Sequence, residues 1–292
     1  MQTTEYKVAI HSFRVNLAEG DSACVLPSFT PFVQPLDNLD RLLFVLTVDP
    51  DFRPAQKGES IGEFDSGGAD FDVYRLPDGG YQYLISAPGG SFDCFLETNA
   101  DFSQGRATLR CAPEHQGFYI NNCLMLMYAF ASAPYYTLLM HASVIANSGR
   151  AFAFLGVSGT GKSTHSCQWL KYIEGSELMN DDNPVFCLLP DGTAHIYGSP
   201  WSGKTPCYRN VEAPIGAFVH IKQAKVNHIE REPVLHAFSS LLISCSTMKW
   251  DKRIYDFTCD TLSQILERVP IYQLECRPDE EAALVCHEAL FA

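Results

Sequence analysis

A glycine-rich segment contains the residues whose types and spacing could do chemistry. Residues 156–163 read GVSGTGKS, which fills every fixed position of the pattern G-x-x-x-x-G-K-[ST]. In such a loop, glycines let the backbone curl so that successive N–H groups turn inward and bind phosphate oxygens. The lysine reaches the terminal phosphates, and the hydroxyl of the last residue is a ligand for Mg²⁺. The segment therefore predicts a nucleotide-binding loop, although a chance match in a glycine-rich turn is the alternative.

The nucleotide is expected to be ATP. A D-x-x-G match at residues 65–68 precedes the loop, which is the reverse of the order in GTPases. Residues 248–251 read MKWD, with Met248 where a guanine-reading motif has Asn. GTP stays open as the alternative. The residues expected to contact the nucleotide within the loop are Gly156, Ser158, Gly159, Thr160, Gly161, Lys162, Ser163 and Thr164.

Two adjacent aspartates, Asp181 and Asp182, follow a stretch that ends like a strand. A metal-bridged triphosphate needs a carboxylate ligand, directly or through water. Phosphoryl transfer to an alcohol also benefits from a carboxylate base near the acceptor. The two acids could divide these tasks. Because Asp-Asp-Asn-Pro is also good turn chemistry, a solvated turn is the alternative.

The elements around the loop are those that a phosphate-binding loop requires. Residues 151–155 read as a strand that enters it, and residues 163–173 read as a helix that leaves it. Further strands are expected at 137–146, 176–182, 184–189, 194–198 and 271–276. Helices are expected at 121–133, 235–246, 261–269 and 278–291. This alternation predicts an α/β domain over residues 119–292.

The first part of the chain has a different character. Six short runs rich in aromatic and β-branched residues lie between residues 6 and 112, separated by turn signals. The sequence PDGGY at 77–81 predicts a hairpin turn, since Asp-Gly-Gly tolerates positive φ. We therefore expect a smaller, β-rich domain with an antiparallel sheet over residues 1–118, of unknown role.

Composition limits the partners and the compartment. The chain of 292 residues has 21 basic and 34 acidic residues, for a net charge of −13. Nucleic acids and anionic membranes are therefore unexpected partners, because binding them needs clustered Lys and Arg. No apolar run is long enough to span a bilayer, and the sequence begins without the pattern of a secretion signal. The 11 cysteines include no C-x-x-C pair, which favours free thiols in a reducing cytoplasm.

Residues 141–185 resemble the catalytic core of the HPr kinase/phosphorylase family. The resemblance rests on HASVIANSGRAFAFLGVSGTGKSTHSCQWL and, further on, ELMNDDNPV, and it continues weakly through YGSPWSGKTPCYRN. That family is itself similar to ATP-dependent phosphoenolpyruvate carboxykinases in its phosphate-binding loop and fold. The resemblance implies a P-loop kinase domain of this type, with ATP and Mg²⁺ as cofactors. A homo-oligomer is suggested by the resemblance alone.

The resemblance also implies roles for single residues. The family's aspartate pair falls on Asp181, as the base, and Asp182, as the metal partner beside Ser163. A histidine on the strand before the loop strand joins the family's active site, and His141 stands at the equivalent spacing. Without the resemblance, His141 would read as a core histidine at a strand end. His165, inside the helix after the loop, has no such support and reads as packing or surface.

Several features depart from the family's pattern. HPr kinases have Glu after the loop Ser, where this chain has Thr164. Their arginine-containing C-terminal loop, which serves the phosphorylase reaction, has no counterpart, and neither do the additional ligand positions of the carboxykinases. The turn-rich segment 197–210 offers Lys204 and Arg209, which could neutralise charge on a transferred phosphoryl group or be ordinary surface charges.

Together these observations predict an ATP-dependent kinase that transfers the γ-phosphoryl group to a hydroxyl of a protein serine or a small molecule. The alternative is a non-catalytic ATP-binding sensor or scaffold that regulates a partner. The sequence does not identify the acceptor.

Overall fold

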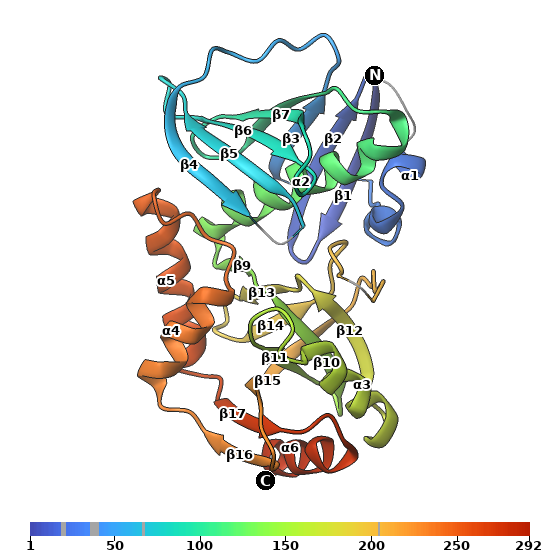
Figure 1. The fold of residues 1–292 in the computed structure, drawn as a ribbon, viewed down its shortest axis with the longest axis vertical. Coiled ribbons are helices and arrows are strands. Elements are labelled where there is room, and N and C mark those ends of the chain that lie inside the picture. Colours follow the sequence, from blue (N-terminus) through green and yellow to red (C-terminus); the bar gives the residue numbers. More distant parts are fainter. Residues whose placement is uncertain (19–21, 36–40, 66–67, 204) are drawn as a thin grey trace. The chain divides into compact units, whose positions relative to one another are not determined.

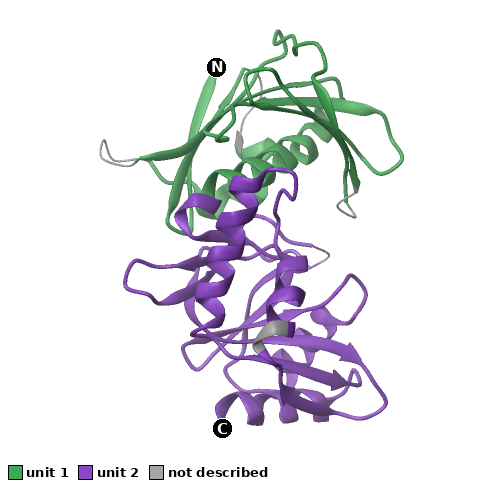
Figure 2. Cartoon of the chain, turned by 90° about the vertical axis from the view of Figure 1, so that its left-hand side faces the viewer, with its two compact units in different colours: residues 1–132 green, residues 133–292 purple. Residues whose placement is uncertain are grey.

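The computed structural model describes residues 1–18, 22–35, 41–65, 68–203 and 205–292. The chain divides into two compact units, residues 1–132 and 133–292 (Figure 2). Helix α2 (Gln116–Ser132) packs on the sheet of the first unit, so the boundary follows this helix instead of lying at its start, near residue 118. Each unit is built on one sheet with helices against it, which makes the protein mixed α/β and rich in strands.

Unit 1 contains an 8-stranded sheet in the order β1-β2-β3-β8-β7-β6-β5-β4 (Figure 1). Its strands are β1 (Gln2–Val8), β2 (His11–Leu17), β3 (Leu42–Val48), β4 (Glu59–Asp65), β5 (Asp70–Arg75), β6 (Tyr81–Ser86), β7 (Phe92–Thr98) and β8 (Gln104–Leu109). The described short helices are α1 (Ser22–Val25), η1 (Pro27–Phe32) and η2 (Pro113–His115). The predicted hairpin turn joins β5 to β6, with Gly79 at φ 87°.

The expectation of a purely antiparallel sheet in unit 1 is wrong at its centre. Strand β3 pairs parallel with both β2 and β8, whereas the other neighbouring pairs are antiparallel. Short hairpins can only join antiparallel strands, but β3 follows a long connection that contains α1 and η1, and it meets β8 from far along the chain. The local strand patterns carry no information on such distant pairings.

Unit 2 contains a 9-stranded sheet in the order β12-β10-β11-β15-β14-β13-β9, with β17 paired to β15 and β16 to β17. Its strands are β9 (Thr137–Leu139), β10 (Ala142–Asn147), β11 (Arg150–Leu155), β12 (Glu177–Asp182), β13 (Val185–Leu188), β14 (Ala194–Tyr197), β15 (Glu212–Gln223), β16 (His228–Arg231) and β17 (Ile271–Cys276). Its helices are η3 (Ala133–Tyr135), α3 (Lys162–Tyr172), α4 (Val234–Ser244), α5 (Lys252–Leu266) and α6 (Glu280–Phe291).

Strand β11 shows how the layers of unit 2 arise. Its side chains alternate between two buried clusters, because successive residues of a strand point to opposite faces. Ala153 and Leu155 join a cluster that includes residues of α4 and α5. Phe152 and Phe154 join the other cluster, with Trp169 of α3 and residues of α6. The sheet is therefore covered on both faces, by α4 and α5 on one and by α3 and α6 on the other.

One edge of the unit 2 sheet gathers the segments that form the candidate site. Strands β11, β15 and β17 run parallel, so their carboxyl ends lie at the same edge. The neighbouring strands β10 and β12 pair antiparallel, which brings the end of β12 beside the start of β10 and the end of β11. Loops at the carboxyl ends of strands are the usual ligand-binding positions of such sheets.

In the portion of the chain that the structure describes, no helix is long and apolar enough to cross a membrane. All cysteines are free thiols. Cys94, Cys187 and Cys276 are buried, whereas Cys167 on α3 is exposed.

Candidate functional site

The glycine-rich segment forms a tight loop between β11 and α3, as the sequence predicted. Gly159 and Gly161 have φ of 85° and 105°, in the left-handed region that favours glycine. At Gly156, a Cβ atom would lie 2.5 Å from Oγ1 of Thr160, so a larger residue would not fit. Both the N–H and the hydroxyl of Thr160 donate to the carbonyl of Val157, at 3.2 and 2.8 Å, which closes the turn.

Several backbone N–H groups of this loop are open at the N-terminus of α3. Among the described residues, no acceptor is hydrogen-bonded to the N–H groups of Gly159, Gly161, Lys162 and Ser163. The first turn of a helix leaves such donors unsatisfied, and the helix dipole adds positive potential there. The loop therefore offers a site for an anion such as a phosphate.

Lys162 points its ammonium group back along the loop. Its Nζ lies 2.8 Å from the carbonyl oxygen of Gly156 and 2.8 Å from Nε2 of His141. Burial lowers the pKa of Lys162, and the carboxylates of Asp182 and Asp181 offset part of this effect. A partly desolvated ammonium gains more from a nearby anion than one in water would.

Ser163 and Asp181 form the second contact of the site. The Ser163 hydroxyl donates to Oδ1 of Asp181 at 2.9 Å, which joins the start of α3 to the end of β12. Asp181 is buried, with 5% of its surface exposed. A hydroxyl and a carboxylate are both hard oxygen donors, which is the ligand type that Mg²⁺ prefers.

His141 and Asp182 form the third contact. Nδ1 of His141 lies 2.8 Å from Oδ1 of Asp182, and the other carboxylate oxygen accepts from Nδ2 of Asn183 at 3.0 Å. Because the Lys162 ammonium can only donate, Nε2 of His141 is the acceptor and the proton is on Nδ1. The side chains of His141 and Asp182 remain 41% and 31% exposed, so both can meet a ligand.

The structure therefore brings together Lys162, Ser163, His141 and both aspartates, as predicted. Ser158 and Thr164 are exposed beside them, and their hydroxyls have no hydrogen bond to another described residue. Among the described residues, no group of three His, Cys, Asp or Glu side chains is placed to hold a metal ion alone. Mg²⁺ in phosphate sites needs only one or two carboxylates, with water and phosphate as further ligands.

Arg209 is not near this group of residues. Its guanidinium donates to the carbonyl of Leu178 and pairs with Glu177 at 2.7 Å, at the other end of β12. The structure therefore gives no support to its predicted contact with the nucleotide. Lys204, the other predicted cation of this segment, lies outside the described residues.

His165 is a packing residue. It is buried, its ring lies edge-on to Phe154 with centroids 4.6 Å apart, and its Nε2 accepts from Trp169 Nε1 at 3.1 Å. Burial lowers its pKa to about 4. The ring is therefore neutral near pH 7 and holds α3 against β11.

Three residues at the site were given no role of their own in the sequence, although Gly203 lies in the turn-rich segment 197–210. Asn183 holds the carboxylate of Asp182, and its position directly after the aspartate pair was the available signal. The N–H of Gly203 donates to the carbonyl of Asp181 at 2.7 Å. The amide of Gln223 contacts the glycine-rich loop. The partners of Gly203 and Gln223 could not be predicted from local patterns, because they lie far away in the sequence.

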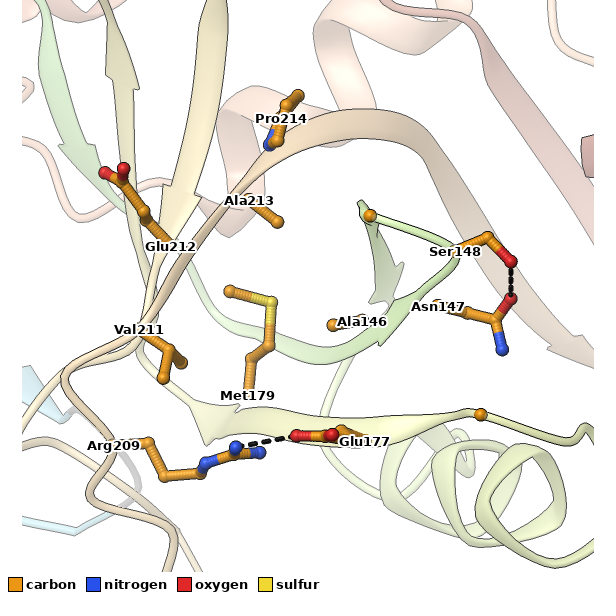
Figure 3. Close-up of a pocket in the computed structure, with 12 residues that line it drawn as sticks. Ala146, Asn147, Ser148, Glu177, Met179, Arg209, Val211, Glu212, Ala213 and Pro214 are labelled. Carbon is orange, nitrogen blue, oxygen red and sulfur yellow. Dashed lines mark hydrogen bonds and ion pairs between the residues drawn. The ribbon is translucent and has the colours of Figure 1, made fainter.

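A shallow cavity lies at the opposite end of β12. It has a volume of about 340 Å³ and a floor that includes Met179 and Ala146 (Figure 3). The Arg209–Glu177 ion pair lies along one side, and the turn at Asn147 and Ser148 lies along another (Figure 3). None of the residues predicted to bind the nucleotide lines it, except Arg209.

No family model matches the chain, and no curated protein matches it at a significant level.

Proposed function

We propose that unit 2 is an ATP-dependent kinase domain of the HPr kinase/phosphoenolpyruvate carboxykinase type, which transfers the γ-phosphoryl group to a hydroxyl. The observation that carries this proposal is that two sets of side-chain contacts lie beside open helix amides, one at each of two adjacent aspartates. Ser163 contacts Asp181, Lys162 contacts His141, and His141 contacts Asp182. An isolated glycine turn would not need two acids from the end of β12 and a histidine from the connection between β9 and β10.

The donors present fit a magnesium–nucleotide complex. Loop amides and Lys162 suit the phosphates, and the oxygens of Ser163 and Asp181 suit Mg²⁺. When bound, ATP supplies the phosphoryl group, and Mg²⁺ neutralises charge on its phosphate oxygens. The contribution of the chain is then positioning and electrostatic stabilisation.

The contacts favour a division of tasks that is the reverse of the one implied by the family resemblance. Asp181 is buried and bound to the Ser163 hydroxyl, which suits the metal side of the site. Asp182 is more exposed and bound to His141 and Asn183, which suits the acceptor side. In our proposal, Asp182 accepts the proton of the attacking hydroxyl, while His141 and Asn183 fix the direction of its carboxylate.

The test combines a binding and a transfer experiment. Mg²⁺-ATP is titrated calorimetrically into the wild type, Lys162→Ala and the control Lys171→Ala, which removes an exposed lysine from the other end of α3. The same proteins are then incubated with γ-labelled ATP and acceptors: free serine, sugars, the protein HPr and a whole lysate. Loss of one charged phosphate contact should weaken binding about tenfold to a hundredfold, by analogy with charged hydrogen bonds of about 1.5–3 kcal/mol.

The proposal requires label on an acceptor with the wild type and Lys171→Ala, and much less with Lys162→Ala. Binding by the wild type without transfer to any of these acceptors would favour the nucleotide-sensing alternative. Equal nucleotide affinity of Lys162→Ala and the wild type would show that the loop is not the nucleotide-binding site.

A further inference from the structure

The amide of Gln223 contacts the outer side of the glycine-rich loop. Gln223 is the last residue of β15, and its Nε2 lies 3.1 Å from the carbonyl oxygen of Gly159 and 3.4 Å from that of Thr160. An amide nitrogen has two hydrogens, one for each carbonyl. Because both partners are acceptors, the orientation of the amide is fixed. One exposed side chain therefore binds two successive peptide groups of the loop.

These contacts set the direction of the peptide that follows Thr160. In a trans peptide, the carbonyl and the N–H of the next residue point in opposite directions. The Thr160 carbonyl faces Gln223, so the N–H of Gly161 faces away from it. That N–H is among those without an acceptor in the described part of the chain. Gln223 thus turns an open donor toward the inner side of the loop.

The loop needs such an anchor because its glycines make it permissive. Gly159 and Gly161, on either side of Thr160, have positive φ, and glycine populates φ of either sign about equally. The peptide between Thr160 and Gly161 could therefore flip at little cost, which would exchange an N–H for a carbonyl oxygen. A carbonyl oxygen facing a phosphate would repel it.

Strand β15 supports the loop at a second point. A Cβ atom at Gly156 would lie 3.3 Å from the carbonyl oxygen of Ile221, so the end of β15 lies directly behind the start of the loop. The anchor at Gln223 is therefore attached to a strand paired on both sides, with β11 and β17.

We propose that Gln223 is a positioning residue for phosphate binding, which holds the Thr160–Gly161 peptide with its N–H directed at the triphosphate. The inference rests on the proposed nucleotide site, and it adds a residue whose own side chain does not contact the ligand. The chemical group recognised through it is the phosphate chain of the nucleotide, not the base.

The test replaces the donor and keeps the length of the side chain. Gln223→Met is compared with Gln168→Met, which makes the same change at an α3 glutamine whose amide contacts Pro278. Affinity is measured calorimetrically for Mg²⁺-ATP and for inorganic tripolyphosphate. Since a typical hydrogen bond contributes about 0.5–1.5 kcal/mol, Gln223→Met should weaken both ligands by about threefold to tenfold. Gln168→Met should weaken neither.

A ligand-free measurement shows whether the change acts through the loop peptide. In ¹⁵N-glycine-labelled protein, the Gly161 amide signal should shift or broaden in Gln223→Met and stay unchanged in Gln168→Met, with equal Tm in both variants. Unchanged affinity, or a loss for ATP without a loss for tripolyphosphate, would overturn the proposal. Failure of the wild type to bind either ligand would overturn both this proposal and the proposed function. Binding without transfer would overturn the kinase assignment alone.

Discussion

The two ends of strand β12 both present carboxylates beside a positively charged side chain, yet their surroundings differ. At its start, Glu177 pairs with Arg209, and their side chains are 64% and 40% exposed. At its end, Asp181 is buried against Ser163, and Asp182 is bound to His141 and Asn183. The first arrangement is a surface ion pair at the side of a shallow cavity. The second links three segments around open helix amides.

Residue type and proximity therefore do not distinguish a binding site from an ordinary surface. Both ends contain an acid, a base and nearby backbone groups, but exposed ion pairs contribute about 0–1 kcal/mol because water competes for each charge. At the other end, burial lowers the pKa of Lys162, and each carboxylate has a specific partner. If the two ends of β12 differ in this way, the same kind of substitution should affect phosphoryl transfer strongly at the end of the strand and weakly at its start.

The largest difference is expected between Asp182→Asn and Glu177→Gln. Both changes remove one negative charge from β12 and keep the side chain's shape. Because general-base catalysis contributes about 100-fold to 10,000-fold, Asp182→Asn should lower the rate of phosphoryl transfer by that factor. Glu177→Gln should leave it within about twofold. The measurement is transfer from γ-labelled ATP at saturating acceptor.

Asp181→Asn separates the two aspartates in the same assay. It should weaken Mg²⁺-dependent nucleotide affinity, whereas Asp182→Asn should bind Mg²⁺-ATP like the wild type. If Asp181→Asn instead kept affinity and lost only transfer, the tasks would be those implied by the family resemblance.

A smaller effect is expected from pH. It concerns the stability of the folded protein through His165 on α3, next to the glycine-rich loop. Burial lowers the pKa of His165 from 6.5 to about 4 in the folded protein. The unfolded chain therefore binds this proton more readily, and stability falls as pH decreases from 6.5 to about 4. The full difference corresponds to about 3 kcal/mol, at 1.36 kcal/mol for each pKa unit.

His165→Gln removes this titration and keeps an acceptor for Trp169. Urea unfolding followed by tryptophan fluorescence should show a weaker loss of stability between pH 6.5 and 4 than in the wild type. The control is His11→Gln in unit 1, where burial also lowers the histidine pKa to about 4. His11→Gln should also weaken the loss of stability at acid pH, and it should leave nucleotide affinity at acid pH unchanged. An unaltered pH dependence in His165→Gln would mean that the ring is not buried as described.

The sequence was most informative at the glycine-rich loop, where the residues that form the feature are neighbours in the chain. The loop at 156–163 lies between a strand and a helix, as its pattern predicted, because the glycines and the flanking apolar runs are local signals. His141 lies between β9 and β10, the aspartates lie at the end of β12, and the family resemblance supplied their proximity. The expected strand at 137–146 is two strands, β9 and β10, interrupted at Met140 and His141.

The features that the sequence did not predict correctly have a common physical cause, which is tertiary packing. Strand β15 was not expected, since Pro214 and Gly216 are residues that usually mark turns or strand edges. Here Gly216 is needed because a Cβ atom would lie 2.6 Å from the ring of Phe152. Arg209 was expected at the nucleotide because its segment is turn-rich and basic. Its partners, Glu177 and Leu178, are set by tertiary packing that no local pattern encodes.

The smallest effect is expected from the Arg209–Glu177 pair itself. A double-mutant cycle with Arg209→Ala and Glu177→Ala should give a coupling free energy below about 1 kcal/mol, because both side chains are exposed. Arg209→Ala alone should cost more than Glu177→Ala, since it also removes the 2.7 Å hydrogen bond to the Leu178 carbonyl. Urea unfolding of the four proteins measures both quantities. Nucleotide affinity should be the same in all of them, and a loss of affinity in Arg209→Ala would show that the two ends of β12 act on one ligand.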